Sequence, residues 1–462
     1  MLFDSNVFNM IDWSNNGVEP CTGMYIQNIK LARLVGNKLQ GPELDLLIRF
    51  NQFQKNDYGF GTGWEFNLSR IDNENGIKTL VLSDGSRYVM TETSDSVTLQ
   101  YKRTQCFTIQ KNSTDTYTLV NKSNITETLT NGKCTQITAA NGKKISLAWD
   151  TSDGYALKIS DESNSQLFAV KKTTASSEYT MTIQAQDGKF VYYIDKKENT
   201  VPALSGVLYV PSGKEKPVPL YSLAYLAHNT SYLMITSFRS CIQYRQEDKV
   251  QYAALPAPSG LTATVYAVSQ LEQFLENEGS TPFYRTLTYS NPRSNYLGTD
   301  HLDLWKSGQD NLQFLPDAFY FTRTVREGNE RVTWNNYNKF YLPIREEPML
   351  PGDTPETGGK DLRKFKTYDY NLVKEKGIDS QPSTFMLPIR QSDAVLQRFG
   401  MEAKPKTVVI EFEYDAFANL TRFLGKTGIQ ESYTYYPAQG ETDPETGRVL
   451  CLSLIHISEP TR

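Results

Sequence analysis

Residues 411–436, EFEYDAFANLTRFLGKTGIQESYTYY, read as one β-hairpin that continues into a third strand. In the residues that lead into this stretch and begin it, every second side chain is apolar: Val408, Ile410, Phe412 and Tyr414. That alternation is the period of a half-buried strand. A short polar break and a Gly-Lys-Thr-Gly turn separate this run from two further apolar runs. The stretch therefore predicts three consecutive antiparallel strands.

The turns within this stretch indicate that the hairpins repeat. Asp415 and Asn419 bracket the first break, where an Asx side chain hydrogen-bonds nearby backbone groups and tolerates left-handed φ. Residues 420–424 supply the return strand, and Tyr414 recurs as Tyr435 about one two-strand unit later. Each unit leaves an apolar face and unpaired backbone edges that only another unit covers. We therefore expect one long sheet built by repetition.

Residues 59–72, GFGTGWEFNLSRID, predict a strand that is entered through a tight backbone approach. Glycines at three of five positions, Gly61 and Gly63 among them, permit that approach. The next side chains alternate between two faces, with Trp64, Phe66 and Leu68 on one and Glu65, Asn67 and Ser69 on the other. We read Trp64 as a core residue, because burying each apolar side chain gains roughly 2 kcal/mol. The alternative is a platform that stacks against a sugar ring.

Dipeptides that favour tight turns recur through much of the chain. Asp84-Gly85 separates residues 79–82 from residues 87–89 and favours a hairpin. The same Asn-Gly or Asp-Gly signal recurs at residues 131–132, 141–142, 153–154 and 187–188. Such dipeptides between alternating runs are a strong short-range hairpin signal. The middle of the chain is thus predicted to be a run of degenerate repeats.

One short helix is expected near residues 269–278. Ser269 and Glu272 spell a capping box, and Gly279 would end the helix. Further on, the tetrapeptide Leu-Pro-Ile-Arg at residues 342–345 returns at residues 387–390, which supports internal repetition. The segment PMLPGDTPETGGK, residues 348–360, is expected to be an exposed flexible loop.

Two groups of residues resemble the Rhs proteins and their YD repeats. The first consists of Tyr414-Asp415, Asn419-Leu420-Thr421, Gly428 and Tyr433-Thr434-Tyr435. The second, near the N-terminus, includes Gly61, Gly63-Trp64, Asn67 and Asp84-Gly85, in the order seen in large Rhs and toxin-complex-like proteins. Ala418 departs from the pattern, because the family usually has Gly at this position before the Asn.

This resemblance implies an all-β fold of consecutive antiparallel hairpins that forms a long curved sheet, part of a hollow β-shell. In that family the shell encloses a cleaved C-terminal toxin, so this chain would be a non-enzymatic wall segment. Its partners would be the missing C-terminal part of the same chain, meaning the remaining shell and the toxin, together with toxin-complex or secretion-machine components. The resemblance also implies a secreted or cell-surface bacterial protein that leaves the cytoplasm through a dedicated export system.

Composition agrees with a β-protein and argues against two classes of partner. The chain has 462 residues, a formal charge of -4, and 12% aromatic residues. Tyrosine and phenylalanine favour strands, and a near-balanced charge argues against a nucleic-acid or membrane surface. No apolar run is long enough to span a bilayer, and the first residues show no signal-peptide pattern. The five cysteines form no CxxC pair and are expected to be free buried thiols.

The sequence offers no catalytic constellation, so no catalytic, cofactor-binding or metal-binding residues are expected. His301 with Asp300 and Asp303 is read as a polar loop, because no further His or Cys cluster supplies ligands. His228 stands alone and is read as an ordinary histidine. A glycosidase is the enzyme class that remains open, since the 52 acidic residues guarantee candidate carboxylate pairs. A secreted or cell-surface carbohydrate-binding or adhesion module is the alternative function.

The tail, residues 452–462 (LSLIHISEPTR), resembles an in-frame translation of a sequencing-library adapter. We therefore expect a non-native tail and a natural protein that continues beyond Cys451. The predicted organisation is a lead-in over residues 1–20, an Rhs-like repeat region over 20–255 and a divergent YD-repeat region over 256–451.

Overall fold

The fold was obtained as a computed structural model. It describes residues 5–458 except 95, 176–177, 197–200, 214–215, 229–230, 243–245, 257–263, 276–281, 290, 292, 300–305, 307, 329–330, 350–361, 398–404, 438–440, 443–448 and 451–453.

Within those residues the structure is all-β, as predicted, with three short 3-10 helices. An inner sheet comprises β1 Gly17–Val18, β2 Tyr25–Val35, β3 Glu43–Phe50 and β4 Trp64–Phe66. A meander follows, comprising β5 Arg70–Glu74, β6 Ile77–Val81, β7 Arg87–Glu92 and β8 Val97–Leu99. The 3-10 helices are η1 Asn6–Asn9, η2 Leu312–Phe314 and η3 Ile378–Ser380.

The remaining strands form a long antiparallel wall in which successive strands are neighbours. Its first part comprises β9 Phe107–Ser113, β10 Thr116–Asn121, β11 Thr126–Thr130, β12 Lys133–Thr138, β13 Lys144–Trp149, β14 Tyr155–Asp161, β15 Gln166–Ala175, β16 Glu178–Ala185, β17 Gly188–Asp195, β18 Ala203–Pro211, β19 Val218–His228, β20 Tyr232–Ser240 and β21 Gln246–Leu255. Its second part comprises β22 Val265–Leu275, β23 Phe283–Tyr289, β26 Tyr320–Glu327, β27 Arg331–Asn338, β28 Pro343–Met349, β29 Leu362–Tyr370, β30 Pro388–Gln397, β31 Lys406–Tyr414, β32 Leu420–Leu424, β33 Gln430–Tyr435 and β36 Leu454–Ser458. Two small ribbons, β24 Ser294–Asn295 with β25 Gly298–Thr299 and β34 Glu441–Thr442 with β35 Val449–Leu450, interrupt this order.

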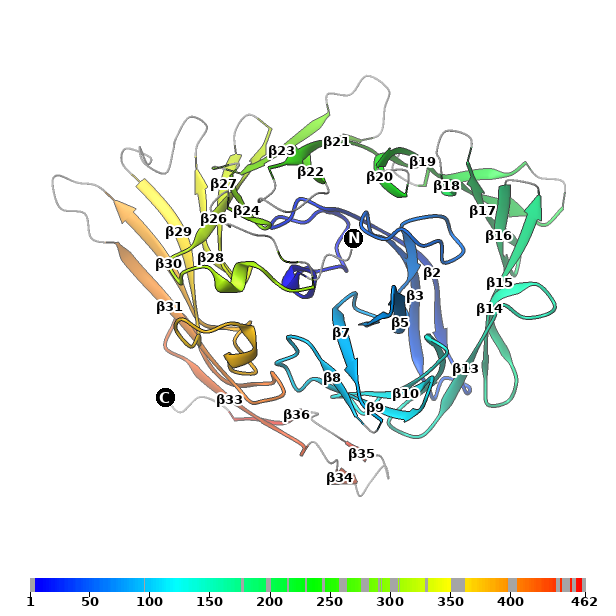
Figure 1. The fold of residues 1–462 in the computed structure, drawn as a ribbon, viewed down its shortest axis with the longest axis horizontal. Coiled ribbons are helices and arrows are strands. Elements are labelled where there is room, and N and C mark those ends of the chain that lie inside the picture. Colours follow the sequence, from blue (N-terminus) through cyan, green and yellow to red (C-terminus); the bar gives the residue numbers. More distant parts are fainter. Residues whose placement is uncertain are drawn as a thin grey trace.

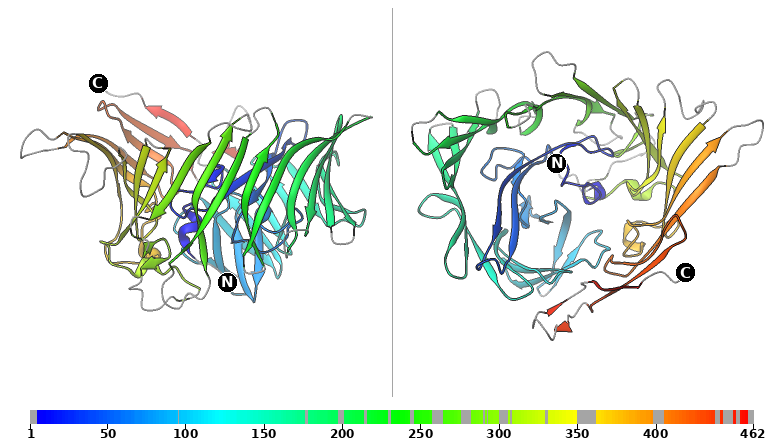
Figure 2. Two further views of the ribbon diagram at one scale, coloured as in Figure 1. Left: turned by 90° about the horizontal axis from the view of Figure 1, so that it is seen from above. Right: turned by 180° about the vertical axis from the view of Figure 1, so that it is seen from behind.

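The wall curves around the inner sheet and the N-terminal segment (Figures 1 and 2). β21 and β22 pair along ten positions, so the sheet continues across the predicted boundary at residue 255. The meander touches the wall through the bridge pair Lys133↔Arg70. The molecule is thus a curved sheet whose concave side faces the inner sheet and the N-terminal segment (Figure 1).

The inner sheet is held to the wall by hydrogen bonds that span large separations in sequence. Thr62 N–H donates to Pro202 O at 2.8 Å, and Val268 N–H donates to Gly23 O at 2.7 Å. Trp64 Nε1 donates to Tyr225 Oη at 2.9 Å. Because these bonds reach both ends of the inner sheet, they fix the distance between the wall and its interior.

Four hairpin loops share a five-residue turn that begins with Asn or Asp. These residues are Asn121, Asp161, Asn338 and Asp415, and each side-chain oxygen accepts the backbone N–H groups two and four positions ahead at 2.9–3.1 Å. The residue three positions ahead has left-handed φ in every case, between 57° and 64°. This is the Asx turn expected at Asp415, and the sequence reading missed the other three.

The recurring tyrosines also share one contact. The hydroxyls of Tyr370, Tyr414 and Tyr435 donate to the carbonyl oxygens of Pro343, Pro388 and Leu420 at 2.8, 3.3 and 2.8 Å. Each acceptor is the first residue of a wall strand. The Leu-Pro-Ile-Arg echo therefore marks equivalent strand starts at β28 and β30.

The short helix predicted near residues 269–278 is wrong in the described part. Val265–Leu275 is strand β22, and residues 276–278 lie outside the described residues. β22 pairs with β21 on one side and β23 on the other. Those two ladders satisfy more backbone groups than a short capped helix would, so tertiary pairing overrides the capping box.

Both ends of the described chain contact the rest of the fold. In the lead-in Val7, Phe8 and Trp13 are buried, whereas residues 14–16 are exposed. In the tail, β36 pairs with the edge strand β33. The loop predicted at residues 348–360 lies outside the described residues, except for Pro348 and Met349, which belong to β28.

Ala418→Gly is expected to stabilise the protein by roughly 0.5–1 kcal/mol. Ala418 has φ 63°. An L-residue in this left-handed region costs roughly 1–2 kcal/mol. Glycine avoids that cost, but it loses more conformational entropy on folding, which offsets part of the gain. Chemical denaturation measures the change. Ala416→Gly is the matched control, because Ala416 in the same exposed turn is not among the left-handed residues. The control is expected to lose stability, and equal effects of the two substitutions would contradict the assignment.

Trp64→Ala is expected to lower the free energy of unfolding by about 3–5 kcal/mol, as for other buried aromatic residues. Trp64 is fully buried, and its ring centroid lies 5.5 Å from that of Phe50. Tyr320→Ala serves as the control, because Tyr320 is 55% exposed. A loss below about 1 kcal/mol at Trp64 would be incompatible with a core role.

Candidate functional site

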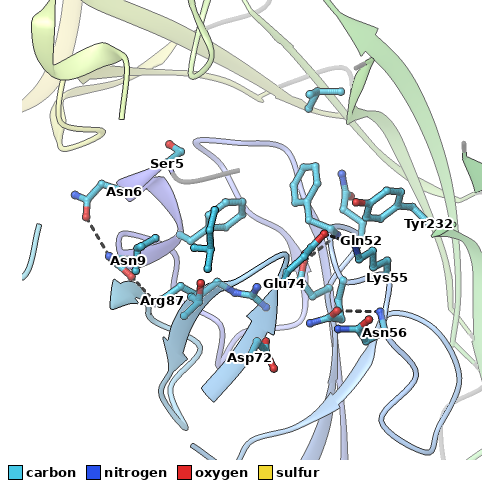
Figure 3. Close-up of a pocket in the computed structure, with 18 of the residues that line it drawn as sticks. Ser5, Asn6, Asn9, Gln52, Lys55, Asn56, Asp72, Glu74, Arg87 and Tyr232 are labelled. Carbon is cyan, nitrogen blue, oxygen red and sulfur yellow. Dashed lines mark hydrogen bonds and ion pairs between the residues drawn. The ribbon is translucent and has the colours of Figure 1, made fainter. Parts of the chain in front are cut away.

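A cavity of about 140 Å³ lies between the N-terminal segment, the loop after β3, the meander and the wall (Figure 3). The N-terminal segment contributes Ser5, Asn6, Phe8 and Asn9 to its lining. Asp72, Glu74, Thr79 and Arg87 come from the meander, and Tyr232 and Met234 come from β20 of the wall. The loop after β3 supplies residues 51–56. The cavity thus exists only when these four parts of the chain come together.

A cluster of charges around the buried Glu65 adjoins this cavity through Arg87, which lines it. The Glu65 carboxylate accepts Arg70 Nη2 at 2.7 Å and Arg87 Nη2 at 3.3 Å. Burial raises the pKa of Glu65, but the guanidinium groups of Arg70, Arg87 and Arg49 outweigh this effect and hold the pKa below its ordinary value. Glu65 therefore stays ionised and neutralises a positively charged interior.

Further ion pairs line the side of the cavity. Lys55 Nζ pairs with Glu74 Oε1. Asp72 Oδ1 accepts Arg70 Nε at 2.9 Å and the Tyr58 hydroxyl at 2.6 Å. Burial, together with Asp72, raises the pKa of Tyr58 to about 12 although Arg70 opposes the shift. Tyr58 thus remains a neutral hydrogen-bond donor.

Asp310 anchors the N-terminal segment at the cavity. Its Oδ2 accepts Asn6 N–H at 2.8 Å and the Tyr341 hydroxyl at 2.9 Å. The Ser5 hydroxyl donates to Tyr341 Oη at 2.9 Å. Burial raises the pKa of Asp310 to about 6, although these hydrogen bonds favour the carboxylate. The N-terminal segment is therefore fixed through one buried acid.

The N-terminal motif residues gather around the inner sheet. A Cβ on Gly61 would lie 2.9 Å from Leu204 N, and one on Gly63 would lie 2.6 Å from the Phe50 ring. Asn67 clamps β3, since its Oδ1 accepts Leu47 N–H and its Nδ2 donates to Asp45 O, both at 2.8 Å. These glycines thus permit close packing. The Asn67 side chain forms hydrogen bonds with the β3 backbone that a neighbouring strand would otherwise form.

The Asp84-Gly85 turn also packs against the N-terminal segment. Asp84 Oδ1 accepts Ser86 N–H at 2.8 Å. Gly85 has φ 97°, and a Cβ there would lie 2.6 Å from the Trp13 ring. The hairpin therefore needs glycine both for its backbone conformation and for its contact with Trp13.

The YD residues lie apart from the cavity, on the wall. Asp415 Oδ2 accepts Asn419 Nδ2 at 3.0 Å, which closes the turn between β31 and β32. Leu420 begins β32, and Gly428, with φ 79°, lies in the turn before β33. The structure thus separates the predicted motif residues into an inner-sheet group and a wall group.

Histidines and cysteines take varied positions. His228 lines the cavity, and its Nε2 lies 3.1 Å from Thr264 O. His301 lies outside the described residues, as do Asp300 and Asp303. Within the described ranges no group of three His, Cys, Asp or Glu side chains is placed to hold a metal ion. Of the thiols, Cys21 and Cys134 are buried as expected, whereas Cys106 and Cys241 are partly exposed.

A second hollow of about 570 Å³ lies along β26 to β29. Its lining includes Glu347, whose carboxylate accepts Arg345 Nη2 at 2.8 Å and Arg363 Nη2 at 2.6 Å. Trp334 and Tyr320 also line it. Two guanidinium groups on one carboxylate leave one excess positive charge there.

Sequence reasoning missed the charge cluster around Glu65. Alternation placed Glu65 on a polar face of its strand, but Glu65 is 3% exposed and pairs with Arg70 and Arg87 of the meander. Arg70 and Arg87 lie at unremarkable spacings in the sequence. Because the partners come from different strands, only the folded chain brings them together.

Comparisons with known proteins show low similarity. No protein-family model matches the chain, and no curated protein matches it. Among solved structures, "TcdB2-TccC3 without hypervariable C-terminal region" matches with 9% identity and a TM-score of 0.32, over 96% of this chain and 33% of the other. A Photorhabdus luminescens Tc holotoxin pore matches with 9% identity and a TM-score of 0.28, over 90% and 32%.

A porin-like protein from Bacteroides uniformis matches with 10% identity and a TM-score of 0.19, over 66% of this chain and 93% of that protein. The chain spans about a third of the length of the two toxin structures. All three TM-scores are too low to support an argument about function. None of the helices in the described part of the chain is long and apolar enough to cross a membrane.

Glu65→Gln is expected to destabilise the protein by about 3–5 kcal/mol at pH 7, because it removes the counter-charge that Arg87 and Arg49 face and leaves Arg70 with Asp72 alone. The folded-state pKa of Glu65 lies below its unfolded value. The ion pair therefore stabilises the fold above the unfolded pKa of about 4.3, and this contribution is lost as the pH falls through the folded pKa. The difference between wild type and variant should shrink accordingly in urea titrations at decreasing pH.

Glu413→Gln provides the matched control. Glu413 pairs with Arg422 at 2.6 Å, but the Glu413 side chain is 58% exposed. Such a pair contributes about 0–1 kcal/mol. The buried cluster would not have the proposed importance if Glu65→Gln lowered the free energy of unfolding no more than Glu413→Gln does. The same would hold if the loss of stability in Glu65→Gln stayed constant with pH.

Proposed function

We propose that this chain is a wall segment of a hollow β-shell, which encloses a polypeptide that continues the same chain. The observation that supports the proposal is the wall itself, an antiparallel sheet that runs from β9 to β33 and curves around an interior (Figure 1). Because the motif residues resemble those of Rhs proteins, we infer that the enclosed part is a C-terminal toxin. In this proposal the chain encloses the toxin and takes part in its delivery, and it has no catalytic role.

The geometry of the wall suits growth by further hairpins. Each hairpin pairs with the one before it, and the repeated Asx turns and tyrosine contacts make successive units equivalent. In the described structure β33 and β36 form the last pair of the wall. Strands present exposed edges unless they are covered, so a continuation of the natural chain would add hairpins beyond β33.

The proposal extends to partners and location. A shell that carries a toxin would associate with toxin-complex components or with a secretion machine, and it would act outside the cell that makes it. The alternative, a carbohydrate-binding or adhesion module, would need exposed aromatic platforms. Trp64, the candidate for such a platform, is fully buried, and its Nε1 donates to Tyr225 Oη. This burial favours the shell.

Limited proteolysis of the natural, uninterrupted gene product tests the proposed function. The expected result is a C-terminal fragment that survives protease while the shell is folded, and that is digested after the shell unfolds in denaturant. Isolated C-terminal polypeptide, digested under the same native conditions, is the control for intrinsic resistance. A C-terminal region that is digested in the intact protein as fast as in isolation would refute enclosure.

A further inference from the structure

The hollow of about 570 Å³ along β26 to β29 lies on the face of the wall that is turned away from the N-terminal segment. Phe321 and Tyr337 pack in the apolar cluster that also contains Phe8 of that segment. Because side chains alternate along a strand, the neighbouring Thr322 and Asn336 lie on the opposite face, and both line the hollow. The hollow is also large enough for a small molecule, since such sites span roughly 300–1,000 Å³.

Strand pairing brings three charged side chains together in this hollow. Arg345 lies opposite Asn336 in the pairing of β27 with β28. Glu347, two residues further along β28, lies opposite Trp334. Residues two apart on a strand share a face, and Arg363 reaches Glu347 from the next strand, β29. Guanidinium groups from two strands therefore flank one carboxylate, and all three side chains line the hollow.

The two guanidinium groups keep accessible donors. Nε and Nη2 of Arg345 both donate to Glu347 Oε2, at 3.0 and 2.8 Å. Nε and Nη2 of Arg363 both lie 2.6 Å from Glu347 Oε1. Neither Nη1 has a hydrogen-bond partner among the described residues, and neither is among the buried atoms that lack one, so both are accessible. The Arg345 and Arg363 side chains are 34% and 20% exposed, whereas the Glu347 side chain is 4% exposed.

The charge of the lining favours an occupant with a single negative charge. Among the described lining residues the charged ones are Arg345, Arg363 and Glu347, two cations and one anion. One carboxylate brings this excess charge to zero. A phosphate group, with a charge of about -1.5 to -2 at neutral pH, would leave excess negative charge beside Glu347.

The uncharged part of the lining suits a hydroxylated frame. Tyr320 lines the hollow and is 55% exposed, so its ring is free to pack against C–H groups. The Thr322 hydroxyl donates to Asn336 Oδ1 at 3.0 Å. Asn336 Nδ2 has no partner in the described part of the chain and is not a buried atom, so it is an accessible donor for a hydroxyl oxygen.

We propose that this hollow binds a small hydroxylated monocarboxylate, of the class of the sugar acids. The ligand carboxylate accepts N–H groups of Arg345 and Arg363, a hydroxyl accepts from Asn336 Nδ2, and the carbon frame packs against Tyr320. The site does not depend on enclosure of a toxin, because it lies on the face of the wall opposite to the N-terminal segment.

Calorimetric titration of the purified 462-residue chain with D-glucuronate and with D-glucose tests the proposal. The two sugars differ at one carbon, which is a carboxylate in the first and a hydroxymethyl group in the second. D-glucuronate is expected to bind wild type at least about tenfold more tightly, because hydrogen bonds between charged groups are the stronger ones. Added salt should weaken its binding by screening. This comparison uses wild type alone, so it does not depend on the folding of a variant.

Arg363→Gln removes the excess positive charge and leaves Glu347 paired with Arg345. This variant is expected to bind D-glucuronate roughly 10–100-fold more weakly, as for loss of a hydrogen bond to a charged group. Arg390→Gln is the matched control, because it makes the same change of charge outside the lining, where Arg390 pairs with Glu411 at 3.4 Å. The control should bind as wild type does.

Three results would overturn the proposal. One is equal binding of D-glucuronate and D-glucose to wild type, or no binding of either at millimolar concentration. Another is equal affinity of Arg363→Gln and Arg390→Gln for D-glucuronate. The third is tighter binding of inorganic phosphate, or equally tight binding of acetate, since the first would contradict the charge and the second the hydroxylated frame.

Discussion

Unpaired strand edges are the constraint on which this structure depends. A single hairpin leaves a row of N–H and C=O groups without partners on each of its two outer edges, and water or another strand must satisfy them. In this chain nearly every wall strand finds its partner in the next hairpin, from β9 through β33. The consequence is a sheet that grows by addition, and the natural twist of its strands makes it curve. Even the short segment of the tail that is described, β36, pairs with the last of these edges.

The interior adds a second constraint, because a curved sheet needs something to cover its concave face. The inner sheet supplies that cover through a large apolar cluster that includes Trp64, Phe50 and Phe60, and the N-terminal segment adds a second cluster that includes Phe8 and Trp13. The same packing buries Glu65 together with Arg49 and Arg70, and Arg87 reaches Glu65 from a half-buried position. A buried charge cluster is costly to break and gives the interior a defined arrangement. The cavity lies beside this cluster, where the N-terminal segment, the loop after β3, the meander and the wall meet without filling the space completely.

The shell function and the cavity are therefore separate consequences of one architecture. The shell depends on the wall and its ability to continue, whereas the cavity depends on how the first hundred residues fold back into the interior. Much of the fold was predictable. The alternation at Phe412 and Tyr414, the Asp84-Gly85 turn and the strand face of Trp64 all follow from local chemistry, and the strands form where these patterns place them. The helix near Ser269 was wrong because its capping signal was weaker than two neighbouring ladders.

By itself the sequence determined the strand periods, many of the hairpin turns and the all-β class, because these depend on residues within a few positions of one another. Only the tertiary structure decided that Glu65 is buried among arginines, that the N-terminal segment packs against the rest of the fold, and that Asn51, Gln52 and Thr79 line one cavity. Those outcomes join residues that lie far apart in the chain. The physical reason is that a side chain's polarity fixes what it needs as a partner, while the packing of distant strands fixes which partner it receives.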